Sequence, residues 1–386
     1  MVFGSRGLDF EDPEPLAPKT YDLPDLPWDK IAGRLEQVTI SILRLDARLE
    51  ASGLSAGWQS RCDMTDAVRA LLLDGYLVDL GDLVLHDAGM DVRSPTHELT
   101  RAASALRARR TAMVRKAPWP LSIDGITALR GIGPAAGVRQ LQPHGGKRDP
   151  DEEDAFPPFA SDADPWKAHF AEIDALLDRT GKVLAGETPL LKSRSHLVYD
   201  LDVDEAENED LWLDVVKRTS HWPAVAAAAV AWDAWLDLNL YTREPWLGLI
   251  MAAAILRARG LTAHLLPLAA GFKRSKFRPQ GREGALEKLQ GFCQVLEEAV
   301  TLGNTDLDRL ILARELMNRV THKCRSNSKL PELVDLFLSR PLVTVPLGAK
   351  MLKVTPKAVD LMLAQLGGAR PRELTGRVRY RAWGIV

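Results

Sequence analysis

The last 45 residues, 342–386, constrain the fold most, because several helix signals follow one another there at short intervals. Residues 345–352 predict a short helix. Thr355 can cap a second helix, with Pro356 at its first position, where a missing N–H breaks no hydrogen bond. The apolar side chains of this second helix recur at i, i+3, i+4 and i+7, at Val359, Met362, Leu363 and Leu366. The pattern predicts two helices joined by a tight turn at Lys353-Val354.

The segment that follows predicts a small β-hairpin. Gly367-Gly368 ends the second helix, because glycine readily adopts the backbone conformations that stop helices. Residues 372–374 and 378–383 flank Thr375-Gly376-Arg377, which has the composition of a hairpin tip. Helix, turn, helix and hairpin together predict a winged helix-turn-helix over residues 326–386, with the hairpin as its wing.

Charge separates this region from the rest of the chain. From Arg340 to the C-terminus there are nine Lys and Arg residues against two acids, a net charge of +7. The whole chain has a net charge of -2, so the other 339 residues carry -9. A basic module on an acidic body is typical of nucleic-acid binding, and we expect double-stranded DNA as the partner. A solvated C-terminal face and a helical protein-docking module are the alternative interpretations.

In the DNA-binding interpretation, the second helix enters the major groove. Lys357 and Gln365 are expected to read bases, because cationic and amide side chains suit base edges there. Thr355, at the start of that helix, belongs to the same predicted surface. The other basic side chains would contact phosphates: Lys350, Lys353, Arg377, Arg379 and Arg381. Helix-turn-helix proteins often read paired half-sites, which would suit a homodimer.

Composition predicts a mostly α-helical protein. Hydrophobic residues make up 46% of the chain and aromatic residues only 6%, and Ala and Leu are abundant. The length of 386 residues suits two or three domains. No apolar run reaches the ~18 residues that a membrane helix needs, and the three cysteines include no CxxC pair. We therefore expect a cytoplasmic protein without membrane segments, disulfides or a metal site.

Apolar periodicity predicts a series of helices upstream of the basic module. The first expected helix follows Trp28, has apolar positions from Ile31 to Leu49 and is closed by Gly53. The others are 65–77, 79–88, 96–113, 166–184, 212–218, 222–240, 246–259, 283–302 and 305–319. The arginines of the fourth helix are expected to face water: Arg101, Arg107, Arg109, Arg110 and Arg115. We expect five parts, namely an irregular arm (1–27), an N-terminal helical region (28–116), a partly disordered linker (117–165), a central helical domain (166–325) and the winged helix-turn-helix (326–386).

Short stretches along nearly the full length carry a family resemblance. They read LPWDKIAGRLEQ, RLDARL, DLVLHDAGMD with SPTHELTRA, AVAWDAWLDLN, WLG, and SRPLV…KVTPKA…LTGRVRYRAWGI. Through them the chain resembles an uncharacterised family of alphaproteobacterial, mainly rhizobial and often plasmid-encoded proteins. The resemblance implies a domain of unknown function followed by a helix-turn-helix DNA-binding domain, and it implies no biochemical activity.

A second, remote resemblance rests on the order of elements in the body. Trp232–Leu238 looks like a helix that leads into a catalytic loop, and Trp246-Leu247-Gly248 like the start of the helix after it. Ala70–Gly75, which ends in Asp74-Gly75, is similar to an inhibitory-helix motif that ends in Glu-Gly. In these respects the chain is similar to the Fic family of AMP-transferring enzymes, which implies a multi-helical Fic-like core.

The chemistry of the Fic family does not transfer to this loop. The resemblance implies a loop histidine as base and a Gly-Asn-Gly-Arg run around phosphates. Here the base position holds Leu238 or Asn239, and neither titrates near neutral pH. The glycines are missing, Pro245 has no N–H to donate, and only Arg243 could contact an anion. We therefore expect a scaffold without transferase activity and without a cofactor.

Other catalytic signals are weak. The GxGxxG-like piece at residues 131–137 follows no predicted strand and contains Pro134. The eight histidines form no HxxxH or HExxH motif, and no nucleophile–base–orienter set is recognisable. The favoured prediction is a sequence-specific DNA-binding protein that acts as a transcriptional or plasmid-maintenance regulator. A protein-interaction scaffold and a cryptic nucleotide-dependent AMP transferase are the alternatives.

Overall fold

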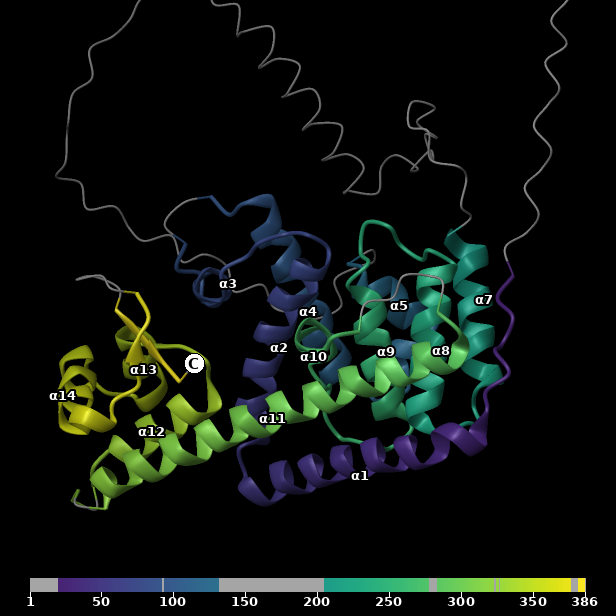
Figure 1. Ribbon diagram of the computed structural model, residues 1–386. Helices are drawn as coiled ribbons and strands as arrows, with labels where there is room; N and C mark the ends of the chain where they lie inside the picture. Colours follow the sequence, from purple (N-terminus) through teal and green to yellow (C-terminus); the bar gives the residue numbers. More distant parts are fainter. Residues whose placement is uncertain are drawn as a thin grey trace, which may run out of the picture. The chain divides into compact units, whose positions relative to one another are not determined.

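Helices make up most of the described chain, as the composition predicts (Figure 1). The computed structural model describes residues 20–91, 94–131, 205–277, 283–322, 324–325, 327–375 and 381–385. All of them belong to one of the two compact units into which the chain divides. Within these residues no helix is long and apolar enough to cross a membrane.

Helix α1 (Trp28–Ser52) packs along helix α11 (Ala285–Thr321), and the two lie side by side in Figure 1. Steps of three and four residues place the buried side chains of α1 on one face: Ile31, Leu35, Val38, Ile42, Leu45 and Leu49. Gly53 ends the helix with φ of 67°, a conformation that glycine adopts without a steric penalty. The first predicted helix and its end are confirmed.

Helix α11 is one helix of 37 residues, whereas the sequence predicts two helices with a break before Thr305. Thr305 caps nothing, because its hydroxyl donates to the carbonyl of Thr301 at 2.9 Å. At Gly303 a Cβ atom would lie 2.8 Å from Leu45 and 3.0 Å from Trp58. Trp58 Nε1 also donates to the Gly303 carbonyl at 2.8 Å. This glycine therefore allows close helix packing inside a continuous helix, and the predicted break is wrong.

Helix α2 (Ser55–Leu73) begins well before the predicted start at Thr65. Its apolar face extends upstream, because Trp58 and Cys62 are buried in the core. Asp63, a residue of the type that often caps helices, lies in the middle of the helix instead. The error arises because residues 55–62 mix polar and apolar side chains without a clear period.

Helices α3 (Leu80–Asp87) and α4 (His97–Val114) have the predicted positions. The side chain of Asp79 accepts a hydrogen bond from Gly81 N at 2.8 Å. The hydroxyl of Thr96 accepts one from Leu99 N at 3.2 Å. Each cap satisfies a backbone donor that the first turn of a helix leaves free.

The expected linker, residues 117–165, begins with helical structure. A 3-10 turn, η1 (Trp119–Leu121), is followed by helix α5 (Ile123–Leu129). Ile126 and Leu129 are buried, so this stretch is part of the packed body and the linker cannot start at residue 117. The rest of that segment lies outside the described residues.

A buried charge network joins α2 to α4. Arg109 is 1% exposed, and its Nε donates to Asp63 Oδ1 at 3.0 Å while Nη1 donates to Asp66. Gln59 donates to Asp63 at 2.8 Å, and the Leu265 carbonyl accepts from Arg109 Nη2 at 3.0 Å. The expectation that Arg109 faces water is therefore wrong, because two carboxylates on the neighbouring helix pair with it inside the core.

Helices α8 (Ala224–Asp237) and α9 (Leu247–Ala258) form the apolar centre of the body, as predicted. They approach closely at Gly248, where a Cβ atom would lie 2.6 Å from the Trp235 ring. Helix α7 (Glu205–Arg218) packs on α8 and starts earlier than the predicted Trp212. Its early start is favourable, because carboxylates in a first helical turn interact well with the helix dipole. Helix α10 (Leu268–Arg274) then packs against α11.

The C-terminal module, residues 330–385, contains three helices and a small antiparallel sheet. The helices are α12 (Leu330–Ser339), α13 (Val345–Leu352) and α14 (Pro356–Leu366), and a 3-10 turn, η2 (Gly367–Ala369), follows them. The strands are β1 (Val343–Thr344), β2 (Arg372–Glu373) and β3 (Ala382–Gly384), in the order β1-β3-β2.

This sheet has one strand more than the sequence predicts. Val343 and Glu373 both pair with Trp383, from opposite sides of β3. The hairpin strands are shorter than the predicted 372–374 and 378–383, and residues 376–380 lie outside the described part of the chain. Two-residue strands give almost no periodic signal in a sequence, which is why β1 was not expected.

Candidate nucleic-acid interface

The helix pair α13–α14 is built by local signals in the sequence. The Thr344 hydroxyl accepts from Leu347 N at 3.2 Å, and the Thr355 hydroxyl accepts from Ala358 N at 3.3 Å. Lys353 makes the turn between the helices with φ of 55°. On α14, the four predicted apolar residues are buried: Val359, Met362, Leu363 and Leu366. The predicted helix-turn-helix is confirmed in both helices, the Thr355 cap and the turn, and the Thr344 cap is an addition to the prediction.

Three predicted contact residues of this helix pair are exposed cations. Lys350 lies on α13, Lys353 in the turn and Lys357 in the first turn of α14. None of the three has a carboxylate partner within the described ranges. The module thus presents uncompensated positive charge around the helix pair, which suits a polyanion.

Two other predicted contact residues have partners inside the protein. Gln365 Nε2 donates to Cys324 Sγ at 3.1 Å, just beyond the end of α11. Arg381 donates to Glu373 Oε2 at 3.1 Å, and its guanidinium lies 4.9 Å from the Trp383 ring centre. Gln365 therefore links the module to the end of α11, and Arg381 joins strand β2 to the start of β3 within the module. The predicted wing contacts Arg377 and Arg379 lie outside the described residues.

Some exposed residues of the module were not among the predicted contacts. Arg370 and Arg372 are exposed beside η2 and on β2. Leu361 on α14 is 63% exposed and Met351 on α13 is 49% exposed. The exposure of Leu361 could have been found in the sequence, because it falls off the apolar stripe of α14. That of Met351 could not, because it follows Leu347 at i+4 and so belongs to the apolar positions of its helix.

Arg61 of α2 fixes the C-terminal module to the body, a role that sequence reasoning missed. Its guanidinium donates to the carbonyl groups of Phe337 and Arg340 at 2.8 Å, and of Leu338 at 3.0 Å. Its Nε donates to the Ile385 carbonyl at 2.9 Å. The first three carbonyls lie at the C-terminal end of α12, where the helix dipole favours a cation. One side chain therefore binds both ends of the module.

The contact between α2 and α12 is also close at the backbone. A Cβ atom on Gly57 would lie 1.9 Å from the Leu338 carbonyl oxygen, so only glycine fits there without a shift. Burial lowers the pKa of Arg61 to about 10, and the charge of Asp306 opposes that shift. Arg61 is still protonated at neutral pH. Its charged guanidinium therefore holds the module by donating hydrogen bonds to neutral carbonyl groups.

Comparisons with known proteins agree with this division of the chain. Residues 330–386 match a family described as "HTH DNA binding domain", and residues 197–322 match one described as "Protein of unknown function (DUF1612)". The uncharacterized protein y4cF of Sinorhizobium fredii (strain NBRC 101917 / NGR234) is 38% identical over 384 residues, which cover 95% of this chain and 100% of that protein. The chain belongs to the same family as this relative. The predicted rhizobial resemblance is thereby confirmed in its domain order and in a rhizobial relative.

The region that matches the DUF1612 description contains the α8–α9 loop. Leu238 is fully buried, and Asn239 is exposed with φ of 54°. Tyr241, with φ of 52°, is buried, and the Arg130 guanidinium lies 3.7 Å from its ring centre. Arg243 is exposed, and its carbonyl accepts from Arg101 at 2.9 Å. Asparagine adopts a positive φ readily, but the bulky Tyr241 does so only under strain, and the packing of its ring against Arg130 holds it in place.

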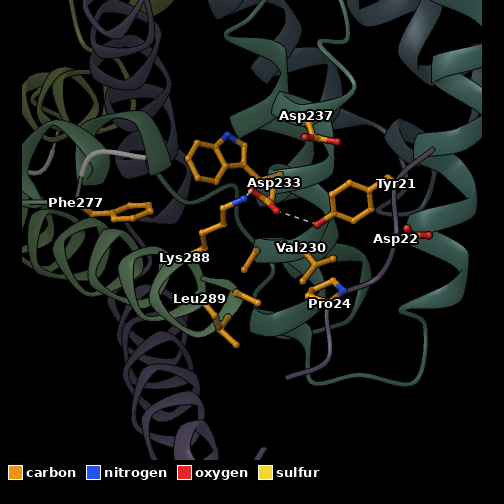
Figure 2. A pocket seen from close by; sticks show the side chains of 12 residues that line it. Tyr21, Asp22, Pro24, Val230, Asp233, Asp237, Phe277, Lys288 and Leu289 are labelled. Atoms are coloured by element: carbon orange, nitrogen blue, oxygen red, sulfur yellow. Dashed lines mark hydrogen bonds and ion pairs between the residues drawn. The ribbon is translucent and has the colours of Figure 1, made fainter. Parts of the chain in front are cut away.

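The same family region also lines a cavity of about 260 Å³ between the N-terminal segment, α8 and the start of α11. Figure 2 shows Tyr21 and Lys288 pointing toward Asp233 at its centre. The Tyr21 hydroxyl donates to Asp233 at 2.9 Å, and Lys288 Nζ lies 2.8 Å from its other oxygen. Burial, followed by the charge of Asp233, raises the pKa of Tyr21, so this hydroxyl remains a donor. Asp233 thus joins three segments and fixes the beginning of α11.

Proposed function

We propose that the protein binds double-stranded DNA through its C-terminal winged helix-turn-helix and acts as a transcriptional or plasmid-associated regulator. The observation that carries this proposal is a set of exposed cations on a capped helix pair that have no carboxylate partner among the described residues: Lys350, Lys353 and Lys357. The match of residues 330–386 to a DNA-binding domain description supports it. Phosphates would complement this charge, and the two helices have the layout that places a recognition helix in the major groove.

The structure refines the roles proposed for single residues. Lys357 is the best base-reading candidate, because it is exposed at the start of α14. Lys350 and Lys353 would contact phosphates and fix the register, and Arg377 and Arg379 remain proposed wing contacts. Gln365 and Arg381 would have to share or leave their partners Cys324 and Glu373 to reach DNA. A homodimer on paired half-sites is proposed as well, since one such module covers only a short site.

For the body we propose a Fic-like helical scaffold without AMP-transferase activity. The order of α8, loop and α9 supports the likeness, and Leu238 and Asn239 supply no titratable base at the relevant position. Incubation with labelled ATP and a target lysate tests this part. AMP transfer above that of a heat-treated control would refute it.

The DNA-binding proposal is tested by selecting bound sequences from random duplexes with the full-length protein. The affinity for a selected duplex is then measured over a range of salt concentrations. Lys350→Ala should reduce the slope of log affinity against log salt by about 0.9 for the lost phosphate contact. Lys30→Ala is the matched control, because Lys30 is exposed on α1 in the body. Failure to select or retain any duplex would favour the alternative function, a protein-interaction scaffold.

A further inference from the structure

The outward face of α14 has an unusual composition for a solvent-exposed helix face. The four apolar residues that point inward leave Lys357, Leu361 and Ala364 on the opposite side, at i, i+4 and i+7. All three are exposed, and Leu361 is 63% exposed. A large aliphatic side chain therefore occupies the centre of the face that a recognition helix would turn toward DNA.

Polar alternatives for base reading are few on this face. Gln365 is on its edge and donates to Cys324. Asp360, on the other edge, is negative and would be repelled by phosphates. This leaves one cation, Lys357, and two apolar side chains to meet the bases.

The major groove offers one apolar group to such side chains, the C5-methyl group of thymine. We propose that Leu361, with Ala364 beside it, recognises a thymine methyl group and so determines part of the DNA sequence that the protein selects. This inference rests on the proposed DNA-binding function. Four residues of helix span about 6 Å, or roughly two base-pair steps, so the thymine should lie about two positions from the base that Lys357 contacts.

Charge argues for DNA, and against a second copy of this chain, as the occupant of this face. A twofold dimer through α14 would bring the same patch against itself, with Lys357 near its own copy. Like charges at the centre of an interface oppose such an association. Duplex DNA supplies the complementary charge and an apolar group in the same groove.

The test combines a protein change with a DNA change. In the selected site, each thymine is replaced in turn by deoxyuridine, which removes only the methyl group. For the wild-type full-length protein, one replacement should weaken binding about fourfold, the value of one buried methyl-sized group. For Leu361→Ala, the same replacement should have no further effect, because the methyl group has lost its partner.

Met351→Ala is the matched control, since Met351 is a similarly exposed apolar residue on α13. It should keep the full sensitivity to deoxyuridine. Unchanged thermal unfolding of both variants confirms that neither exposed side chain is needed for folding. The inference is overturned if wild type binds its site without any methyl sensitivity, or if Leu361→Ala retains it. A change in oligomeric state with Leu361→Ala, and none in methyl sensitivity, would also overturn it. If no duplex is bound at all, the proposed function fails instead.

Discussion

The body and the C-terminal module arrange their charges in opposite ways. In the body, Arg109 is 1% exposed and lies between Asp63 and Asp66. In the module, Lys350 and Lys357 are exposed and have no carboxylate partner among the described residues. A buried charge is tolerated only when it is paired, whereas an exposed unpaired charge remains available to a partner. The comparison separates charges that maintain the fold from charges that can bind.

Arg61 stands between these two cases. It is half-buried, whereas Arg109 is fully buried, and its closest acceptors are neutral backbone carbonyls, not carboxylates. Its partners belong to α12 and to Ile385, so this charge neither stabilises the body alone nor faces a ligand. It holds the two regions in one orientation, which fixes how α14 is presented.

Replacing Arg109 should give the largest effect. Arg109→Leu leaves Asp63 and Asp66 buried without a counter-charge, and burial already raises the pKa of Asp66 against the opposing charge of Arg109. We expect a loss of roughly 3–5 kcal/mol in the free energy of unfolding, measured by urea denaturation.

The adjacent residue provides the control. Arg110 pairs with Asp87, with a distance of 2.9 Å from Nη2 to Oδ2, and its side chain is 38% exposed. Arg110→Leu should change the free energy of unfolding by less than about 1 kcal/mol. Similar losses in the two variants would mean that burial does not distinguish these ion pairs.

The next largest effect on stability should come from a substitution at the contact between the body and the C-terminal module. Gly57→Ala places a methyl group against the Leu338 carbonyl and should destabilise the protein by about 1–3 kcal/mol, the usual effect of overpacking. Amide hydrogen exchange should locate the loss of protection in α12. Gly33→Ala on α1 is the control, because nothing lies within 4 Å of its Cβ position. That change should stabilise the helix by roughly 0.5–1 kcal/mol. Normal protection of α12 in Gly57→Ala would contradict the close packing.

Local signals in the sequence predicted the C-terminal module best. The cap of its second helix and its turn depend on neighbouring residues, so Thr355 and Lys353 could be interpreted without knowledge of the fold. The body was harder, because its features depend on contacts between distant segments. Gly303 looks like a helix break until Leu45 and Trp58 are known to pack on it.

The same limit applied to the candidate site. The exposed lysines and the buried stripe of α14 followed from helical periodicity. The partner of Gln365 could not be predicted, because Cys324 lies 41 residues away at the end of another helix. Nor could the role of Arg61, which donates not only to the nearby Gly57 carbonyl but also to backbone carbonyls more than 270 residues further along the chain. Periodicity identifies which face is exposed, but it does not show which other segment reaches that face.

Within the module, substitutions of Lys357 and Lys350 should affect DNA binding in different ways. Lys357→Ala should relax the preference at one base pair, at a loss of about 1–3 kcal/mol for the preferred sequence and less for others. Lys350→Ala should weaken binding to all sequences alike. Binding of each variant to the selected site and to single-base changes of it measures the difference. Uniform weakening by both would make Lys357 a phosphate contact.

The smallest effect concerns Asp74, a charge of the body that is only partly compensated. Burial raises its pKa to about 6 against the opposing charge of Arg101, and its Oδ2 has no hydrogen-bond partner among the described residues. Because the folded-state pKa lies above the unfolded value of about 3.9, the ionised carboxylate destabilises the fold. This destabilisation is absent below pH 4, grows as the pH rises to about 6, and stays constant above it.

Asp74→Asn should therefore stabilise the protein at pH 8, by less than about 1 kcal/mol since the group is partly solvated, and the gain should shrink at pH 4.5. Urea midpoints at the two pH values measure it, with the exposed Asp335→Asn as control. A variant that is less stable than wild type at pH 8 would show that the Asp74 carboxylate has a favourable partner, and would place it with Asp63 and Asp66 among the compensated charges.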